Sequence, residues 1–140
     1  MAHLDAYLFF DGSCAAAMRF YETVLGARLE MMQTYAEAPA AHSEKSSPSN
    51  ADRIMHARLD VDGRALMGSD FPAGEAHPGM HGFALSINYP SVFEARQVFD
   101  ALAQGGSITM PFGETFWAEG FGMLTDKFGT PWMVNVDKPK

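Results

Sequence analysis

A segment that occurs twice constrains the fold of this chain most strongly. The first copy, from Leu8 to Leu29, reads LFFDGSCAAAMRFYETVLGARL, and a weaker copy from Leu85 to Ile108 reads LSINYPSVFEARQVFDALAQGGSI. Each copy has the pattern of a strand, a turn, an amphipathic helix and a terminating glycine. The sequence therefore predicts one structural module that is used twice.

Both predicted helices have one apolar face and recognisable ends. Apolar residues recur at helical spacing, at Ala17, Phe20, Tyr21, Val24 and Leu25 in the first copy and at Ala95, Val98, Phe99 and Leu102 in the second. Ser13 is predicted to cap the start of the first helix, and Gly26 to end it in the left-handed conformation. Ser91 and Glu94 form a capping box for the second helix, which ends before a pair of glycines.

Length and charge exclude several classes of protein. A chain of 140 residues is expected to form a single domain, residues 1–140, in which two small modules share a core. The net charge of -7 argues against nucleic acid as a partner, because phosphates require a basic surface. No apolar run could span a membrane, and the N-terminal sequence lacks the features of a signal peptide. With one cysteine there is no internal disulfide framework, so we expect a cytoplasmic protein.

The remaining strands complete the two modules. Module one (1–70) and module two (81–140) flank a linker at 71–80 that contains two prolines and two glycines. Asp62 and Gly63 form a strong hairpin signal in module one. The predicted strands are residues 4–10, 27–35, 53–61 and 64–69 in module one, and 82–88, 107–112, 121–125 and 131–136 in module two, where the helix covers 92–103.

One long segment has no periodic pattern. Residues 36–52 are rich in alanine, serine and proline, which indicates a surface loop. A lid over a binding site and an insertion without function are equally good interpretations of this loop.

Strand 53–61 separates apolar from polar side chains. Met55, Ala57, Leu59 and Val61 alternate with Ile54, His56, Arg58 and Asp60. The apolar set is expected to pack against helices, which leaves His56, Arg58 and Asp60 on the opposite side of the sheet. We therefore expect an α+β fold of two tandem βαβββ modules, whose curved mixed sheet encloses a cavity.

Three segments in this order resemble the PhnB-like branch of the vicinal oxygen chelate superfamily. They read FDGSCAAAMRFYETVLGA near the start, HARLDVDGRALMGSD in the middle and FGETFWAEGFGMLTDKFGTPWMVN near the end. The superfamily includes glyoxalase I, extradiol dioxygenases, and fosfomycin and bleomycin resistance proteins. The resemblance implies paired βαβββ modules in a homodimer, with cavities built from both modules and sometimes a domain swap between chains.

The resemblance also implies positions for a metal site. Glyoxalase-type members hold an octahedral divalent ion, which acts as a Lewis acid on substrate oxygens. The corresponding positions here are Ala6 or the adjacent Asp5, then His56, then Gly82 or the adjacent His81, and finally Met133. His56 alone matches cleanly, and a methionine is no ligand for a hard cation. A divalent metal is thus compatible with His56, although most of the family's ligand positions are unmatched.

His56 is the main candidate for chemistry. A histidine can serve as a metal ligand or as a general base near neutral pH. The alternative is a hydrogen-bonded histidine on a half-buried strand. Arg58 and Asp60 could orient a polar substrate, but a pair between these two side chains is the favoured interpretation.

Other residues are predicted to line the ligand pocket. Tyr7 and Phe9 on the first strand, Phe112, Trp117 and Phe121 in module two, and Met133 would supply flat or adaptable apolar walls. Ser86 and Asn135 could donate hydrogen bonds to a ligand. The alternative for the aromatic residues is core packing. Cys14 lies in the first turn of a helix, where its pKa could be lowered, but a small buried side chain is the favoured interpretation.

Two classes of function are consistent with these features. The leading hypothesis is a homodimeric lyase-, isomerase- or transferase-type enzyme, or a ligand-binding protein, with an aromatic- and methionine-lined cavity. The competing hypothesis is a metal-free protein that sequesters a small molecule, as bleomycin resistance proteins do. A methyltransferase is not expected, because no glycine-rich loop is followed by an acidic residue that would bind a nucleotide-like methyl donor.

Overall fold

The computed structural model describes residues 2–37 and 50–139 and divides the chain into two compact units. The units are Met1–Pro78 and Gly79–Lys140, and each contains one helix and one four-stranded sheet. The predicted α+β fold of tandem βαβββ modules is confirmed. The shared core and the enclosed cavity stay predictions. The predicted lid at 36–52 lies mostly outside the described residues.

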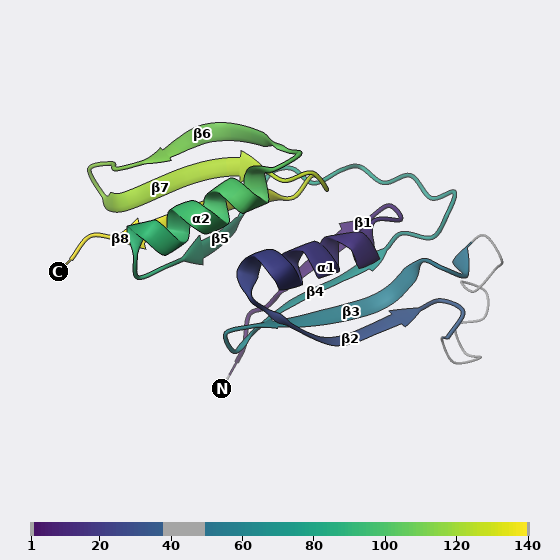
Figure 1. Cartoon of the computed structure of the whole chain (residues 1–140). Coiled ribbons are helices and arrows are strands. Elements are labelled where there is room, and N and C mark those ends of the chain that lie inside the picture. The colour runs from purple at the N-terminus through teal and green to yellow at the C-terminus, as the bar shows by residue number, and fades with distance from the viewer. Residues whose placement is uncertain (1, 38–49, 140) are drawn as a thin grey trace. The chain divides into compact units, whose positions relative to one another are not determined.

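The first unit forms a mixed sheet in the order β1-β4-β3-β2. Its elements are β1 (Ala6–Phe10), α1 (Cys14–Leu25), β2 (Arg28–Thr34), β3 (Ile54–Val61) and β4 (Arg64–Asp70). Strand β1 runs parallel to β4, and the other neighbouring pairs are antiparallel. The helix returns the chain from β1 to the far edge of the sheet, where β2 lies (Figure 1).

The second unit repeats this topology in the order β5-β8-β7-β6. Its elements are β5 (Leu85–Asn88), α2 (Val92–Ala103), β6 (Ser107–Gly113), β7 (Ala118–Thr125) and β8 (Pro131–Asp137). Strand β5 begins later than predicted and β7 begins earlier, while α2 has the predicted bounds. Among the described residues, neither helix is long and apolar enough to cross a membrane.

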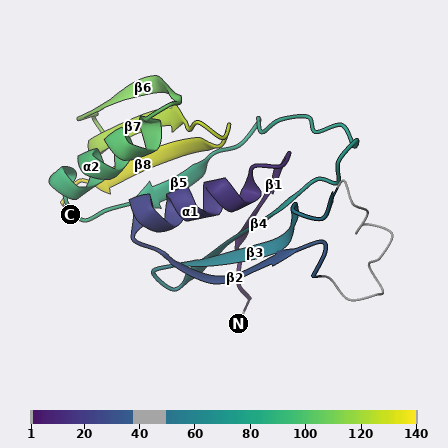
Figure 2. The same ribbon diagram turned by 45° about the vertical axis from the view of Figure 1, so that its right-hand side comes forward.

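Each helix covers one face of its own sheet (Figures 1 and 2). In α2 the buried residues are the predicted stripe. In α1 they are Cys14, Ala17, Met18 and Tyr21, while Phe20, Val24 and Leu25 of the predicted stripe are half-buried. The helix packs closely over Gly68, where a Cβ would lie 2.7 Å from the flexible Met18 methyl group and 3.0 Å from the backbone oxygen of Leu8. We call the helix-free face of each sheet its open face.

The local turn and cap signals are mostly confirmed. Asp62 and Gly63 both have positive φ (49° and 88°), as a two-residue hairpin turn requires. Gly26 ends α1 in the left-handed conformation, and the Ser91 hydroxyl accepts a hydrogen bond from Glu94 N. The cap at Ser13 was predicted wrongly, since the Ser13 side chain makes no capping hydrogen bond.

A buried carboxylate takes the place of that cap. Asp70, at the end of β4, is only 2% exposed. Its Oδ1 accepts hydrogen bonds from the backbone N–H groups of Gly12 (2.9 Å) and Cys14 (3.0 Å), and its Oδ2 accepts one from Ile54 N (2.8 Å). Its carbonyl oxygen also accepts a hydrogen bond from the Tyr35 hydroxyl (3.0 Å). One residue therefore fixes the start of α1, the start of β3 and the residue after β2.

A second buried carboxylate organises the β7–β8 turn of the other unit. Asp126 Oδ1 accepts hydrogen bonds from Phe128 N and Thr130 N, and its Oδ2 accepts one from the Trp132 indole at 2.9 Å. Asp126 is 3% exposed. Buried polar groups are stable when they are satisfied in this way.

Replacing Asp70 should destabilise the protein strongly. Asp70→Ala leaves three buried or half-buried N–H groups without their acceptor, so the free energy of unfolding should fall by roughly 3 kcal/mol or more. Asp70→Asn should lower the free energy of unfolding by less, because its amide oxygen can still accept hydrogen bonds. Urea unfolding followed by circular dichroism measures both. The exposed Asp52→Ala is the control, and an equal effect of Asp52→Ala and Asp70→Ala would contradict this role of Asp70.

Candidate functional site

A hydrogen-bonded pair of rings lies on the open face of the first sheet. The Tyr7 hydroxyl and His56 Nδ1 are 3.0 Å apart, and the two rings stack with centroids separated by 5.6 Å. Tyr7 comes from β1 and His56 from β3, while their neighbours Leu8 and Ala57 are buried under α1. Among the described residues, His56 makes no other hydrogen bond, so its Nε2 is not engaged within the first unit.

An exposed aromatic side chain extends this pair. The ring of Phe9, two residues along β1, lies 5.1 Å from the ring of Tyr7. Phe9 is 49% exposed and Tyr7 is 38% exposed, which is unusual for large apolar groups on a packed sheet. The structure thus brings together Tyr7 and Phe9, which the sequence analysis assigned to a ligand pocket, and His56, its main candidate for chemistry.

Arg58 is held by a carboxylate other than the predicted one. Its Nε lies 3.2 Å from Glu30 Oε1, and its Nη1 lies 3.7 Å from Met67 Sδ. The expected pair between Arg58 and Asp60 is wrong, because Glu30 on the neighbouring strand β2 is the partner. Arg28 also contacts Glu30, at 3.3 Å. Glu30 thus lies between two arginines, and the Arg58 guanidinium is already engaged by an ion pair.

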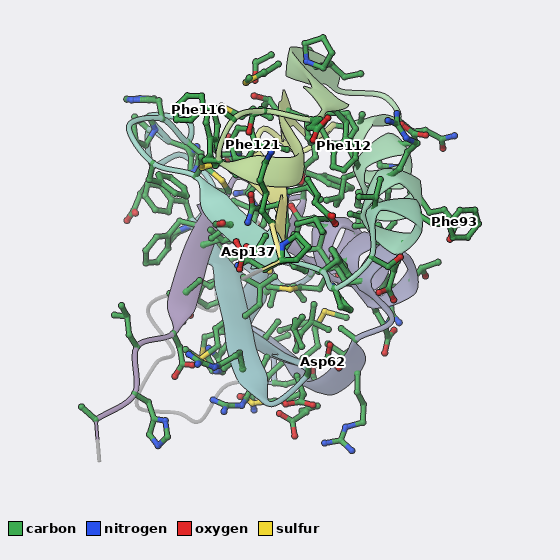
Figure 3. All side chains as sticks on the ribbon, turned by 90° about the vertical axis from the view of Figure 1, so that its left-hand side faces the viewer. Asp62, Phe93, Phe112, Phe116, Phe121 and Asp137 are labelled. Atoms are coloured by element: carbon green, nitrogen blue, oxygen red, sulfur yellow. The ribbon has the colours of Figure 1, made fainter. Side chains whose placement is uncertain are left out.

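Aromatic residues also gather on the second unit. The ring of Trp117 packs edge-on against Phe121 at 5.4 Å and against Phe116 at 4.8 Å. Trp117 is 47% exposed and Phe116 is 88% exposed, whereas Phe121 is buried. This cluster surrounds the start of β7 (Figure 3 labels Phe116 and Phe121).

The polar candidates of the second unit are paired within it. Asn135 Nδ2 donates hydrogen bonds to Asn88 Oδ1 and Asp137 Oδ1, both at 2.9 Å. Both N–H groups of Asn135 are thereby used, which leaves its oxygen for other contacts. Ser86 is exposed on β5, where it is the register partner of the half-buried Met133 on β8.

Phe112 lies apart from the other predicted pocket residues. Its ring packs 5.5 Å from the ring of Phe99 on α2, and the Arg96 guanidinium lies 5.0 Å from its centre. Phe112 is 9% exposed and sits on the helix-covered side of the sheet (Figure 3). This position matches the alternative of core packing that the sequence left open, and a role for Phe112 in the ligand pocket stays a prediction.

Comparison with known proteins decides the family. The sequence profile described as "Glyoxalase/Bleomycin resistance protein/Dioxygenase superfamily" matches residues 3–134. The chain belongs to this superfamily. The assignment predicted from the sequence is confirmed.

Individual relatives align over nearly the full length. Protein YjdN of Escherichia coli (strain K12) is 42% identical over 142 residues, which cover 96% of this chain and 95% of YjdN. The crystal structure of PA1353 from Pseudomonas aeruginosa is 42% identical, with a TM-score of 0.89 and coverage of 99% and 100%. The PhnB protein of Bacillus cereus is 24% identical, with a TM-score of 0.80 and coverage of 96% and 99%, and therefore shares the fold.

Among the described residues of each unit, the side chains do not gather into a metal site. Within residues 2–37 and 50–139, no three His, Cys, Asp or Glu side chains come together to hold an ion. Asp5 instead accepts a hydrogen bond from Ala65 N, and the register partner of His56 on β2 is the amide Gln33. A divalent ion needs several hard oxygen or nitrogen ligands, so we assign no chemical step to a metal.

Cys14 is a structural residue. Its side chain is completely buried. Burial raises the pKa of the Cys14 thiol far above its ordinary value, and the negative charge of Asp70 raises it further. The alternative of a helix-activated thiol is thus wrong, because the protonated form is favoured.

The sequence analysis did not identify two residues that lie near the Tyr7–His56 pair. Glu30 lies on the edge strand β2, and strand register was the signal that could have placed it beside Arg58. Phe71 lies in the segment interpreted as a linker, yet its ring packs against Phe9 at 5.7 Å. Its position directly after Asp70, at the end of β4, was the available signal.

The raised pKa of Cys14 predicts a dependence of stability on pH. In the unfolded chain the thiol loses its proton near pH 8.5, while in the folded chain it stays protonated. The stabilisation is therefore complete below about pH 8.5 and decreases above it, by roughly 1 kcal/mol per pH unit. Urea unfolding between pH 7.5 and 9.5 should show this decrease, and Cys14→Ala should lack it. If the free energy of unfolding falls equally steeply with pH in wild type and in Cys14→Ala, the raised pKa of Cys14 is contradicted.

Proposed function

We propose that this protein binds a small organic molecule on the open face of its first sheet, with His56 contacting a polar group of the ligand. The observation that carries the proposal is the Tyr7–His56 hydrogen bond of 3.0 Å beside the exposed ring of Phe9. A few polar groups on an apolar surface are typical of small-molecule sites. Membership in the superfamily supports binding in general, but it does not specify the ligand.

The Tyr7 hydroxyl allows His56 to act in two ways. When the hydroxyl donates to Nδ1, the proton of the imidazole is on Nε2, which then donates to a ligand oxygen. When Nδ1–H donates to the hydroxyl oxygen, Nε2 is unprotonated and can accept a ligand proton. One imidazole can thus recognise a carbonyl or a hydroxyl group.

The rings next to this pair supply the apolar part of the surface. The exposed faces of Tyr7 and Phe9 can stack on a flat ligand, and Met67, the register partner of Tyr7 on β4, adds an adaptable thioether. Because Glu30 already holds the partly exposed Arg58 guanidinium, we do not assign Arg58 to an anionic group of the ligand. A mostly neutral ligand with one hydrogen-bonding group fits best.

A second candidate function is transformation of the bound molecule by His56 as a general base. The favouring observation is again the contact with Tyr7, because the Nδ1–H tautomer presents an unprotonated Nε2 to the ligand. The two candidates differ in turnover. Phenylacetone is neutral and has a ring and an acidic C–H group next to a carbonyl, so NMR in D2O would reveal exchange at that carbon. Exchange that disappears in His56→Ala supports the base, and binding without exchange supports a sequestering protein.

Binding of phenol tests the primary proposal. In an NMR titration, His56→Ala should weaken phenol binding by about 5- to 10-fold, since a net hydrogen bond contributes roughly 1 kcal/mol. Tyr7→Phe keeps the ring and should weaken phenol binding by less than His56→Ala does. His3→Ala, which changes an exposed residue near the N-terminus, is the matched control. Unchanged affinity in His56→Ala, with affinity lost in Trp117→Ala, would place the site on the second sheet and overturn the proposal.

A homodimer, with or without a domain swap, is proposed on the basis of superfamily membership alone. Light scattering at micromolar concentration should give twice the mass of the chain. A stable monomer would contradict this assembly.

A further inference from the structure

The rings on the open face of the first sheet belong to a longer row. The ring of Phe71 lies 5.7 Å from that of Phe9, and the ring of His77 lies 4.9 Å from that of Phe71. With the Tyr7–Phe9 and Tyr7–His56 contacts, five rings follow one another in the order His77, Phe71, Phe9, Tyr7, His56. All five are half-buried or exposed. The row therefore continues well beyond the polar contact at His56.

The segment after β4 is fixed against β1 by hydrogen bonds. Phe71 N donates to Phe10 O at 2.7 Å, and the imidazole Nε2 of His77 is 2.7 Å from Phe9 O. Because a carbonyl oxygen can only accept, His77 must donate this hydrogen bond. Arg53 Nη1 also donates to Phe71 O at 2.7 Å. Both backbone groups of Phe71 are thus held, and its ring is presented in a defined position.

We propose that this row binds an extended planar molecule of at least two joined rings, in which Phe71 contacts the ring farther from His56. His77 is a positioning residue that holds the backbone of Phe9 and the edge of Phe71. This inference rests on the proposed function, because His56 still contacts the polar group. A single-ring ligand would contact Tyr7 and Phe9, whereas a second ring would reach Phe71.

The observed ring geometry favours stacking with such a ligand. The Tyr7 and His56 rings are stacked at an angle of 22°, while Phe71 meets Phe9 at 61° and His77 at 71°. Tilted and edge-on rings hold one another in place and leave parts of their faces open to a further aromatic group. Because the protein has already ordered the row, little conformational freedom is lost on binding.

The test compares phenol with 2-naphthol, which has the same hydroxyl group and one more fused ring. In NMR titrations, wild type should bind 2-naphthol about 5- to 10-fold more tightly than phenol. Phe71→Ala should remove most of this preference and leave phenol affinity nearly unchanged. Phe71→Leu keeps apolar bulk without a ring, so it should also reduce the preference and serves as a variant that is expected to fold.

His77 is tested by a conservative replacement. His77→Ala should reduce the preference for 2-naphthol several-fold, and His77→Gln should recover part of it by restoring a donor to Phe9 O. A purely structural role would lower the affinities of both probes together and leave their ratio unchanged. Phe93→Ala is the control, because Phe93 is 74% exposed and points away from α2 (Figure 3).

The outcomes separate the two proposals. If wild type binds neither probe, the proposed function fails. If phenol binds through His56 but Phe71→Ala and Phe71→Leu keep the full preference for 2-naphthol, the proposed function stands and the extended row is overturned. A preference that depends on Phe71 and His77 but not on Phe93 supports the inference.

Discussion

The first unit depends on the buried carboxylate of Asp70. Three backbone N–H groups from two distant parts of the chain converge on its two oxygens, and the Tyr35 hydroxyl binds its carbonyl. A carboxylate that is 2% exposed is stable only when it is well hydrogen-bonded, so these segments must be in place together. Because Asp70 ends β4, which lies between β1 and β3, the same interaction sets the strands that carry Tyr7 and His56.

The two faces of the first sheet carry different kinds of side chain. On the helix side, Gly68 lets α1 approach closely, and the buried side chains of Ala57 and Leu59 fill the core. On the open face, Tyr7 and His56 make a polar contact inside a row of rings that packing of the core does not require. The helix side thus carries the buried core residues, and the open face carries half-buried and exposed rings.

The sequence predicted the features that depend on local signals. Helix α2 has the expected bounds because its apolar stripe and its Ser91 cap lie within the helix and next to it. The cap at Ser13 was predicted wrongly because Asp70 accepts the hydrogen bond from Cys14 N instead. Asp70 is 56 residues away in the sequence, and local patterns do not reveal such a distant partner. Phe112 was proposed as a pocket wall because it is aromatic, and its packing against Phe99 on α2 is a tertiary contact that the sequence pattern does not show. Which polar groups meet on the open face depends on strand register.

The central claim is that His56 on the open face of the first sheet contacts the ligand. It can be tested most directly by long-range ¹H–¹⁵N correlation of the histidine side chains while phenol is added, with His56 assigned by comparison with His56→Ala. We expect a saturable shift of the His56 Nε2 resonance, while the resonances of His3 and His81 stay in place. Saturable binding of phenol elsewhere on the protein, with both His56 nitrogens unaffected, would contradict it.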